Sequence, residues 1–383
     1  MNAPPPRLFL SPPHMSGREL DYVREAFASN YVAPAGPMLE AFEARLAAYT
    51  GIPHVVAVSS GTAAIHLALK ALALTRGDEI WASTLTFIGS VGPAIQEGLV
   101  PVFLDADPQS WTMDTALLAE ELRKAAKSGR LPKAVIPTDI YGQSCDLDRI
   151  VALCDEHGVP VICDSAEAMG ARYKDRHAGE GGFATVFSFN GNKIITTSGG
   201  GALASRDAKV IEHARYLATQ ARAPVVHYEH DDVGFNYRMS NICAAIGLGQ
   251  LEVLDQRVAR RRRIFDLYRE RLHDLPGLSF MPEAGYGRST RWLTVILIDE
   301  RQIGVSRETV RLQLEAVNIE SRPVWKPMHL QPVFRQARHV GGKIAEELFE
   351  KGLCLPSGSQ MSDDQIDRVA ETIRGAARSA RNG

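Results

Sequence analysis

Apolar residues recur along this chain in short unbroken runs, and amphipathic segments lie between most of them. Apolar runs without polar alternation are typical of strands that are buried on both faces. The intervening segments place apolar residues three and four positions apart, which indicates helices that cover a sheet. The predicted strands are His54–Val58, Glu79–Ala82, Val100–Leu104, Ala134–Thr138, Val159–Cys163, Thr185–Phe189 and Ala202–Ala204. The predicted helices between them are Ala63–Leu74, Asp114–Ala126 and Leu147–His157.

This alternation predicts an α/β domain with a mostly parallel central sheet and helices on both faces. Two helices precede the first strand, and the second of them spans Pro37 to Gly51. One long helix is predicted after the sheet, from Ser240 to Leu272, and shorter strands and helices follow it. We therefore expect a large domain over residues 1–250. Residues 251–383 are expected to hold the long helix and a small C-terminal α+β domain.

Composition narrows the class of protein. A chain of 383 residues suits two domains, and a net charge of −2 leaves no broad basic field for a nucleic-acid backbone. The five cysteines are scattered without metal-ligand spacing, and their odd number favours reduced thiols. No uncharged run approaches the length of a membrane span, and the first residues lack the apolar core of a signal peptide. We therefore expect a cytoplasmic protein without a metal, a nucleic-acid partner or a membrane insertion.

The first chemical signal follows the first predicted strand. No G-x-G-x-x-G or Walker A sequence stands there; the chain instead reads Ser59-Ser-Gly-Thr-Ala63 and opens a helix. Small residues at a helix N-terminus let backbone N–H groups and the Thr62 hydroxyl approach a phosphate. The same turn is also typical of plain N-capping, so the signal is weak alone.

The second signal is Asp164, which an apolar strand delivers at its carboxyl end. Ligands bind at this edge in open α/β sheets. A carboxylate there can pair with the ring nitrogen of a cofactor and keep it protonated. The alternative, that Asp164 caps the next segment, is equally consistent with the residue alone.

The third signal is Lys193, which closely follows a predicted buried strand and precedes Gly199, Gly200 and Gly201. An ammonium at the rim of an apolar sheet is costly to bury, whereas a neutral imine is tolerated. The glycines allow the backbone to lie close to a ligand. A surface lysine after a strand is the more common reading of such a residue taken singly.

The three signals follow one another in the order of fold-type I pyridoxal-phosphate enzymes. That cofactor needs an anion clamp, a partner for its ring nitrogen and a lysine that forms a Schiff base. Each signal also has an ordinary structural explanation, and these explanations are independent of one another. The three signals together are therefore much stronger evidence for a cofactor site than any one of them. The sequence therefore predicts pyridoxal 5′-phosphate as the cofactor.

Longer motifs carry a family resemblance. They read Ser59-Ser-Gly-Thr-Ala-Ala64, Thr86-Phe-Ile-Gly-Ser90, Tyr141-Gly-Gln143, Asp164-Ser-Ala-Glu167, Ser188-Phe-Asn-Gly-Asn-Lys193, Phe235-Asn-Tyr-Arg-Met-Ser-Asn241 and Arg322-Pro…Pro327-Met-His-Leu-Gln-Pro332. With these, the chain resembles the DegT/DnrJ/StrS family of sugar aminotransferases from about Leu10 to Val369. The resemblance implies a pyridoxal-phosphate fold of type I and a homodimer whose active sites are shared between subunits.

The resemblance also implies roles for individual residues. Lys193 is the catalytic lysine, Asp164 holds the pyridine nitrogen, and Phe87 stacks on the ring unless it is a core aromatic. His329 lies near the sugar unless it is a structural histidine. Glu167 stands where many members have Gln or His near the ring's phenolic oxygen, so it is expected to be protonated or to face another group. The phosphate group is assigned to Gly61, Thr62, Ala63 and Ser188, with Asn236 from the other subunit.

Within the family, several stretches are similar to the C4-aminotransferases of N,N′-diacetylbacillosamine synthesis (the PglE type). This similarity implies L-glutamate as the amino donor and UDP-2-acetamido-2,6-dideoxy-4-hexulose as the acceptor, with Asn30, Tyr31, Val32 and Ala33 lining the sugar pocket. A C3- or C4-aminotransferase acting on a dTDP- or GDP-keto-sugar is the alternative. A C3 dehydratase of the same fold is disfavoured because its relatives carry His at the position of Lys193. A non-enzymatic regulatory relative is a further rival, and it predicts no bound chromophore.

Overall fold

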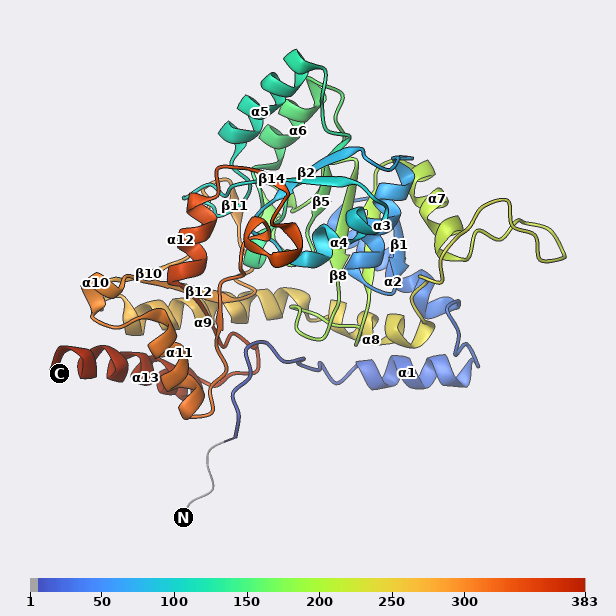
Figure 1. Ribbon diagram of the computed structural model, residues 1–383. Coiled ribbons are helices and arrows are strands. Elements are labelled where there is room, and N and C mark those ends of the chain that lie inside the picture. Colours follow the sequence, from blue (N-terminus) through green and yellow to red (C-terminus); the bar gives the residue numbers. More distant parts are fainter. Residues whose placement is uncertain (1–5, 383) are drawn as a thin grey trace.

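A large sheet lies at the centre of the computed structural model, which describes residues 6–382 (Figure 1). Two four-stranded parts, ordered β1-β9-β8-β5 and β14-β3-β2-β4, make up this sheet. Parallel bridges Val135–Val161 and Thr138–Asp164 join β4 to β5, so the two parts are continuous. All these strands run in one direction except β9, which is antiparallel to both its neighbours. The strands are β1 (His54–Val58), β2 (Glu79–Ser83), β3 (Val100–Leu104), β4 (Ala134–Ile136), β5 (Ile162–Asp164), β8 (Ala184–Ser188), β9 (Gly201–Ser205) and β14 (Arg338–Val340).

Helices cover both faces of this sheet because alternate strand residues point to opposite sides and almost all of them are apolar. Val56 and Ile80 pack with α3, α4 and α7 on one face. Val55 faces α2 and α8, and Trp81 faces α5 and α6 on the same side of the sheet. The helices are α1 (Glu19–Ala28), α2 (Pro37–Thr50), α3 (Gly61–Ala71), α4 (Gly92–Gln96), α5 (Thr115–Ser128), α6 (Leu147–Asp155), α7 (Ala208–Ala218) and α8 (Asn241–Leu251).

A second, antiparallel sheet follows in the C-terminal part, with the order β10-β12-β15-β13. Its apolar side chains pack against α9, α11 and α13. Its strands are β10 (Leu278–Phe280), β12 (Thr294–Ile298), β13 (Arg322–Pro323) and β15 (Gly352–Leu355). The helices of this part are α9 (Leu254–Leu272), α10 (Glu300–Ile303), α11 (Arg307–Ala316), α12 (Lys343–Lys351) and α13 (Asp363–Asn382). Three two-residue strands, β6 (Arg172–Tyr173), β7 (Arg176–His177) and β11 (Gly287–Arg288), form a small separate sheet.

The predicted fold class is confirmed: the central sheet is mostly parallel and helices cover both faces. The short strands β6, β7, β11 and β15 were not predicted, and two larger details also differ from the sequence-based expectation. The helix predicted from Ser240 to Leu272 is interrupted at Glu252–Val253, because α8 packs against α1 and α2 whereas α9 packs against α13. The edge strand β14 was not predicted, and it comes from the C-terminal part of the chain.

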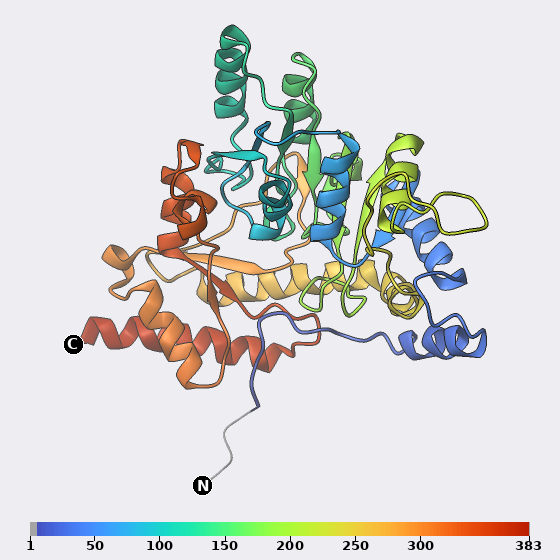
Figure 2. The same cartoon turned by 45° about the vertical axis from the view of Figure 1, so that its right-hand side comes forward.

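The two ends of the chain are tied together by an extended N-terminal strap, residues 8–14. Leu8 exchanges backbone hydrogen bonds with Asn318 and Glu320, at 3.0 and 2.9 Å. Ser357 N–H donates to the carbonyl of Leu10 at 2.8 Å. The strap therefore lies along the C-terminal sheet before the chain reaches α1, the blue helix at the lower right of Figure 2. The predicted domain boundary at residue 250 stays a prediction. The N-terminal strap packs on the C-terminal sheet, and β14 from the C-terminal part joins the central sheet. Within residues 6–382, no helix is long and apolar enough to cross a membrane.

Candidate active site

A cavity of about 410 Å³ opens where β1, β2, β4, β5 and β8 end. Parallel strands bring their carboxyl ends to the same edge of a sheet, and ligands bind there in open α/β folds. Residues that follow five strands thus meet in one place although the sequence separates them widely. The lining residues are Ser59, Ser60, Gly61, Thr62, Ile65, Thr86, Phe87, Gly89, Ser90, Thr138, Asp164, Ala166, Glu167, Ser188, Asn190, Asn192, Lys193, Gly199, Gly200 and Trp325.

The N-terminus of α3 forms one wall of the cavity. Ser60 caps the helix, and its Oγ accepts the Ala63 N–H at 3.0 Å. Gly61 and Thr62 face the cavity, where the first backbone N–H groups of a helix lack intrahelical partners and favour an anion. A Cβ on Gly61 would lie 3.1 Å from the Cβ of Ser188, so a glycine lets these two strand ends approach. Ala63 is buried and does not line the cavity, and its N–H is already bound to Ser60.

Asp164 ends β5 and is only 4% exposed. One carboxylate oxygen accepts the hydroxyl of Ser90, and the other accepts the Ala166 N–H at 3.2 Å. Burial raises the pKa of Asp164, while the hydrogen bond from Ser90 and the charge of Lys193 act in the opposite direction. Among the described residues, no cationic side chain forms an ion pair with this carboxylate. A protonated ring nitrogen would supply the missing positive partner.

Lys193 and Glu167 contact each other in the lining of the cavity. Lys193 Nζ lies 3.3 Å from Glu167 Oε1, and the lysine side chain is 12% exposed. The other oxygen of Glu167 accepts the Tyr141 N–H at 2.7 Å. Burial raises the pKa of Glu167 to about 7, although the charge of Lys193 opposes this shift. Lys193 Nζ also lies over the Trp292 ring, 4.3 Å from its centroid, where an ammonium is attracted to the aromatic face.

Two aromatic side chains border the cavity. Phe87 is 58% exposed although it follows the buried strand β2. Its ring lies 5.4 Å from that of Trp325, at an angle of 51°. An exposed apolar ring in a cavity lined by polar groups is typical of a surface that a flat ligand covers. Phe87 is therefore a rim residue and not part of the core.

These features fit pyridoxal phosphate. The helix N-terminus with Ser188 would hold its phosphate, the buried Asp164 would pair with its ring nitrogen, and Lys193, in the same cavity, would supply the amine for its Schiff base. The exposed face of Phe87 suits the ring itself. All four groups stand on elements that the strand ends hold in place, so the cavity is preformed.

Some of the predicted site residues lie outside this cavity. Asn236 is exposed and pairs with Thr219 in a short bridge. Residues 30–33 are also exposed, and Asn241 holds them by donating its side-chain amide to the Tyr31 carbonyl and its backbone N–H to the Ala33 carbonyl. Neither segment lines the cavity of its own chain. Their assigned roles stay predictions, and both roles require a second subunit or a bound sugar.

His329, which is expected to lie near the sugar, stands beside the cavity lining and not in it. It is buried, and it does not line the cavity. Its Nδ1 lies 2.6 Å from Thr84 Oγ1 and its Nε2 lies 3.1 Å from Glu346 Oε1. Its ring stacks on His339 at 4.6 Å. Both ring nitrogens therefore have protein partners, and a contact with substrate stays a prediction.

Several residues of the site were not assigned roles from the sequence. Ser90 binds Asp164, the backbone of Tyr141 binds Glu167, and Trp292 and Trp325 border Lys193 and Phe87. Ser90 and Tyr141 stand within the family motifs, so those motifs were an available signal. Trp325 lies inside the motif that spans residues 322–332, whereas Trp292 belongs to none of the motifs, so no local pattern connects Trp292 to the cavity.

Comparison with known proteins agrees with this geometry. Residues 13–374 match the DegT/DnrJ/EryC1/StrS aminotransferase family. The chain is 50% identical to EpsN of Bacillus subtilis (strain 168), to which a pyridoxal phosphate-dependent aminotransferase activity has been attributed; the match covers 96% of this chain and 95% of EpsN. It is 37% identical to GDP-perosamine synthase of Caulobacter vibrioides, covering 96% and 98% of the two chains.

Solved structures show the same fold over nearly the whole chain. Aminotransferase TlmJ from Streptoalloteichus hindustanus superposes with a TM-score of 0.90 at 30% identity, covering 98% of this chain and 100% of TlmJ. DesI, solved with its TDP-sugar product, gives a TM-score of 0.90 at 30% identity, covering 99% and 95%. Together with the cavity described above, these matches show that the chain belongs to the DegT/DnrJ/EryC1/StrS aminotransferase family and is a pyridoxal phosphate-dependent sugar aminotransferase.

Proposed function

We propose that this enzyme transfers the amino group of L-glutamate to C4 of a nucleotide-linked 4-keto-6-deoxy sugar, UDP-2-acetamido-2,6-dideoxy-4-hexulose. The observation that carries the proposal is Lys193 Nζ, held at 3.3 Å from Glu167 in a cavity whose lining includes Asp164. The class of substrate is supported by relatives named for GDP-perosamine and for a TDP-sugar product. The choice of UDP rests on the sequence stretches shared with bacillosamine-type enzymes.

The residues of the cavity divide the chemistry among them. Pyridoxal phosphate, when bound, supplies the electron sink and carries the amino group between the two substrates. Lys193 Nζ takes the proton from Cα of glutamate in the first half-reaction and returns a proton to C4 of the sugar in the second. Asp164 holds a positive ring nitrogen in place, which keeps the electron sink effective. Glu167 keeps the Lys193 amine in the cavity, through the 3.3 Å contact, while the amine is not transferring a proton.

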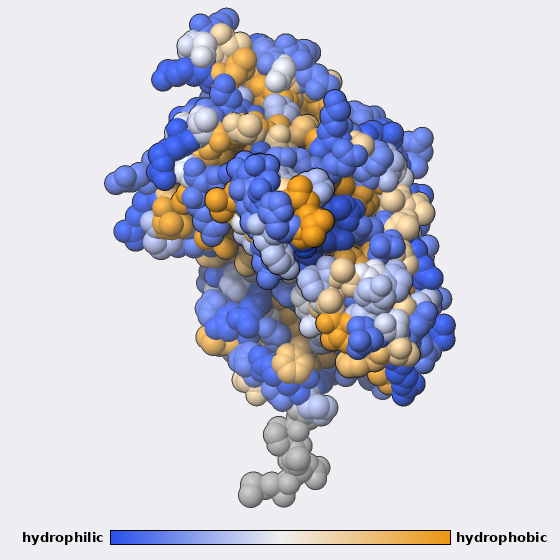
Figure 3. Space-filling model, turned by 90° about the vertical axis from the view of Figure 1, so that its right-hand side faces the viewer, coloured by the Kyte–Doolittle hydropathy of each residue, from blue (hydrophilic) through white to orange (hydrophobic). Residues whose placement is uncertain are grey.

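We also propose a homodimer whose subunits complete each other's sites. The segment of residues 222–234 projects from the body (Figures 1 and 2) and exposes Val226 fully, Tyr228 to 79% and Val233 to 91%. Apolar side chains lie scattered among hydrophilic ones on that side of the molecule (Figure 3). Asn236 follows this segment after Phe235 and is exposed. A second copy would cover these side chains and receive Asn236. The five cysteines are free, which supports action in the reducing cytoplasm.

Lys193→Arg tests the central role. The variant keeps a cation in the cavity, yet an arginine neither forms the imine nor exchanges protons near neutral pH. We expect the purified wild-type protein to absorb at the imine band and to lose that band when glutamate is added, whereas Lys193→Arg does neither and has no turnover. Lys351→Arg, on the surface of α12, is the control and should behave as wild type. Appreciable transamination by Lys193→Arg would disprove the assignment.

A glutamate-coupled assay over UDP-, dTDP- and GDP-linked 4-keto sugars tests the substrate. The highest kcat/KM is expected for the UDP-linked acetamido sugar, with the product amine at C4. A preference for a GDP or dTDP sugar, or amination at C3, would replace the UDP proposal while leaving the aminotransferase chemistry intact. A protein without a chromophore would favour a regulatory role.

A further inference from the structure

Arg261 is a fully buried arginine outside the cavity. Its side chain lies on α9, is 1% exposed, and forms no ion pair with any carboxylate of the described residues. Burial lowers its pKa to about 9. Its Nη1 donates to the carbonyl of Trp292, and its Nη2 donates to Ser11 Oγ at 2.9 Å. A buried guanidinium without a counter-ion is costly, and its hydrogen bonds offset only part of that cost because its Nε has no partner.

The two groups that Arg261 holds both bind the turn that carries Lys193. Ser11 Oγ donates to the carbonyl of Asn192 at 2.6 Å, and Trp292 Nε1 donates to the same carbonyl at 2.8 Å. Arginine can only donate, so Ser11 must accept from Arg261 and give its single proton to Asn192. The direction of the hydrogen-bond chain is therefore determined: Arg261 to Ser11 to Asn192.

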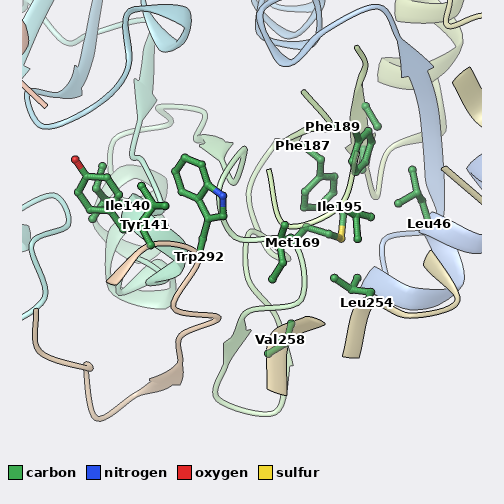
Figure 4. Packing of buried hydrophobic residues seen from close by; sticks show 14 of the residues in the cluster. Leu46, Ile140, Tyr141, Met169, Phe187, Phe189, Ile195, Leu254, Val258 and Trp292 are labelled. Atoms are coloured by element: carbon green, nitrogen blue, oxygen red, sulfur yellow. The ribbon is translucent and has the colours of Figure 1, made fainter. Parts of the chain in front are cut away.

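Asn192 directly precedes Lys193 in an irregular segment between β8 and β9. Within that segment, Lys193 N–H donates to the carbonyl of Asn190 at 3.0 Å, which makes a turn and not a helix. The direction of the lysine side chain thus depends on the contacts that other segments make with this turn. Trp292 contacts it twice, through Nε1 at the backbone and through its ring beneath Nζ at 4.3 Å. Figure 4 shows Trp292 between Tyr141 and the cluster around Phe187 and Met169, where its ring is buried.

We propose that Ser11, Trp292 and Arg261 are positioning residues for Lys193. The chain of hydrogen bonds fixes the carbonyl that precedes the lysine, and the indole ring fixes the direction of its amine. Ser11 lies on the N-terminal strap, so the strap that pairs with residues 318–320 also braces the catalytic turn. This inference rests on the role proposed above for Lys193.

Two mild variants test it in the full-length protein. Ser11→Ala removes one donor to Asn192, and Trp292→Phe removes the other while it keeps an aromatic ring. In each we expect kcat to fall about tenfold, with KM for glutamate and for the keto sugar within about twofold of wild type, because misplacement of the amine affects the reacting state more than binding. In the apoprotein, hydrogen exchange of the amides in residues 193–197 should be about fivefold faster or more.

Ser16→Ala is the matched control, since Ser16 also belongs to the N-terminal segment but its hydroxyl bonds at the start of α1, with the Arg18 N–H and Glu19, and not with Asn192. It should change neither kcat nor exchange in residues 193–197. Unchanged kcat together with unchanged exchange in both test variants would overturn the proposal, as would an equal loss in Ser16→Ala. Faster exchange of the turn in a protein whose Lys193→Arg variant retains turnover would instead overturn the role of Lys193, so the two failures are distinguishable.

Discussion

Ser90→Ala removes a single hydroxyl that the structure places against Asp164. Ser90 is 2% exposed and Asp164 is 4% exposed, so water cannot replace the lost donor easily. The hydroxyl belongs to a buried chain: Thr138 donates to Thr86 at 2.9 Å, and Thr86 lies 2.6 Å from Ser90. After the substitution, the Ala166 N–H is the one protein donor to Asp164 that remains among the contacts described. The ionised form of Asp164 is thereby destabilised.

The size of the effect follows from the kind of bond. A hydrogen bond to a charged group contributes about 1.5–3 kcal/mol, and one pKa unit corresponds to about 1.4 kcal/mol. The pKa of Asp164, already raised by burial, should therefore rise further when this hydrogen bond is lost. If the cofactor's ring nitrogen pairs with ionised Asp164, the affinity for pyridoxal phosphate should fall roughly 10- to 100-fold.

Titration of the apoprotein with pyridoxal phosphate, followed at the imine band, measures this affinity. The loss of affinity for pyridoxal phosphate in Ser90→Ala should be greater near pH 6 than near pH 8. A carboxyl group of higher pKa is more often protonated at the lower pH, and the protonated form cannot pair with a positive ring nitrogen. Ser205→Ala is the control, since Ser205 is also buried and donates at 2.7 Å, to the Phe183 carbonyl away from the cavity. An unchanged affinity in Ser90→Ala, or an equal loss in Ser205→Ala, would refute the reasoning.

Two further predictions concern stability. Burial raises the pKa of Glu167 from 4.5 to about 7, so between these pH values the folded apoprotein keeps a proton that the unfolded chain releases. The free energy of unfolding of wild type, relative to Glu167→Gln, should therefore fall as the pH rises from 4.5 to 7 and level off above it. A difference in thermal midpoint that does not depend on pH would contradict this. Asp105 accepts the N–H groups of Gly342, Ile344 and Ala345 at the start of α12, at 2.6, 3.1 and 3.0 Å. Asp105→Ala should cost about 2 kcal/mol or more in urea unfolding and Asp105→Asn less, whereas equal midpoints would show that the cap is dispensable.

Much of the fold was predictable because local pattern and burial agree in it. The strands of the central sheet are buried on both faces, so their apolar runs mark them almost to the residue, as at His54–Val58 and Val100–Leu104. The three anchors of the site stand at the ends of such strands or within a few residues of them. Asp164, Lys193 and the Ser59–Ala63 turn could therefore be placed at one sheet edge from sequence order alone.

The remaining features depend on tertiary packing that no local pattern records. The antiparallel direction of β9 follows from a short return through the Lys193 turn, which an apolar run cannot reveal. The break between α8 and α9 falls at Glu252–Val253, where neither residue is a glycine or proline that would indicate the end of a helix. Ser11, Trp292 and Arg261 come from three distant segments, and their relation to Lys193 exists only in the folded chain.

The edge strand β14 has a consequence for how the chain acquires its structure during synthesis. Arg338–Val340 pair with Val102–Leu104, more than two hundred positions earlier. Until the ribosome has released these late residues, β3 presents an unpaired backbone edge to other chains. Pairing over such a separation also slows folding. We therefore expect a fragment that stops before Arg338 to aggregate through β3, however complete its cavity-forming strands are.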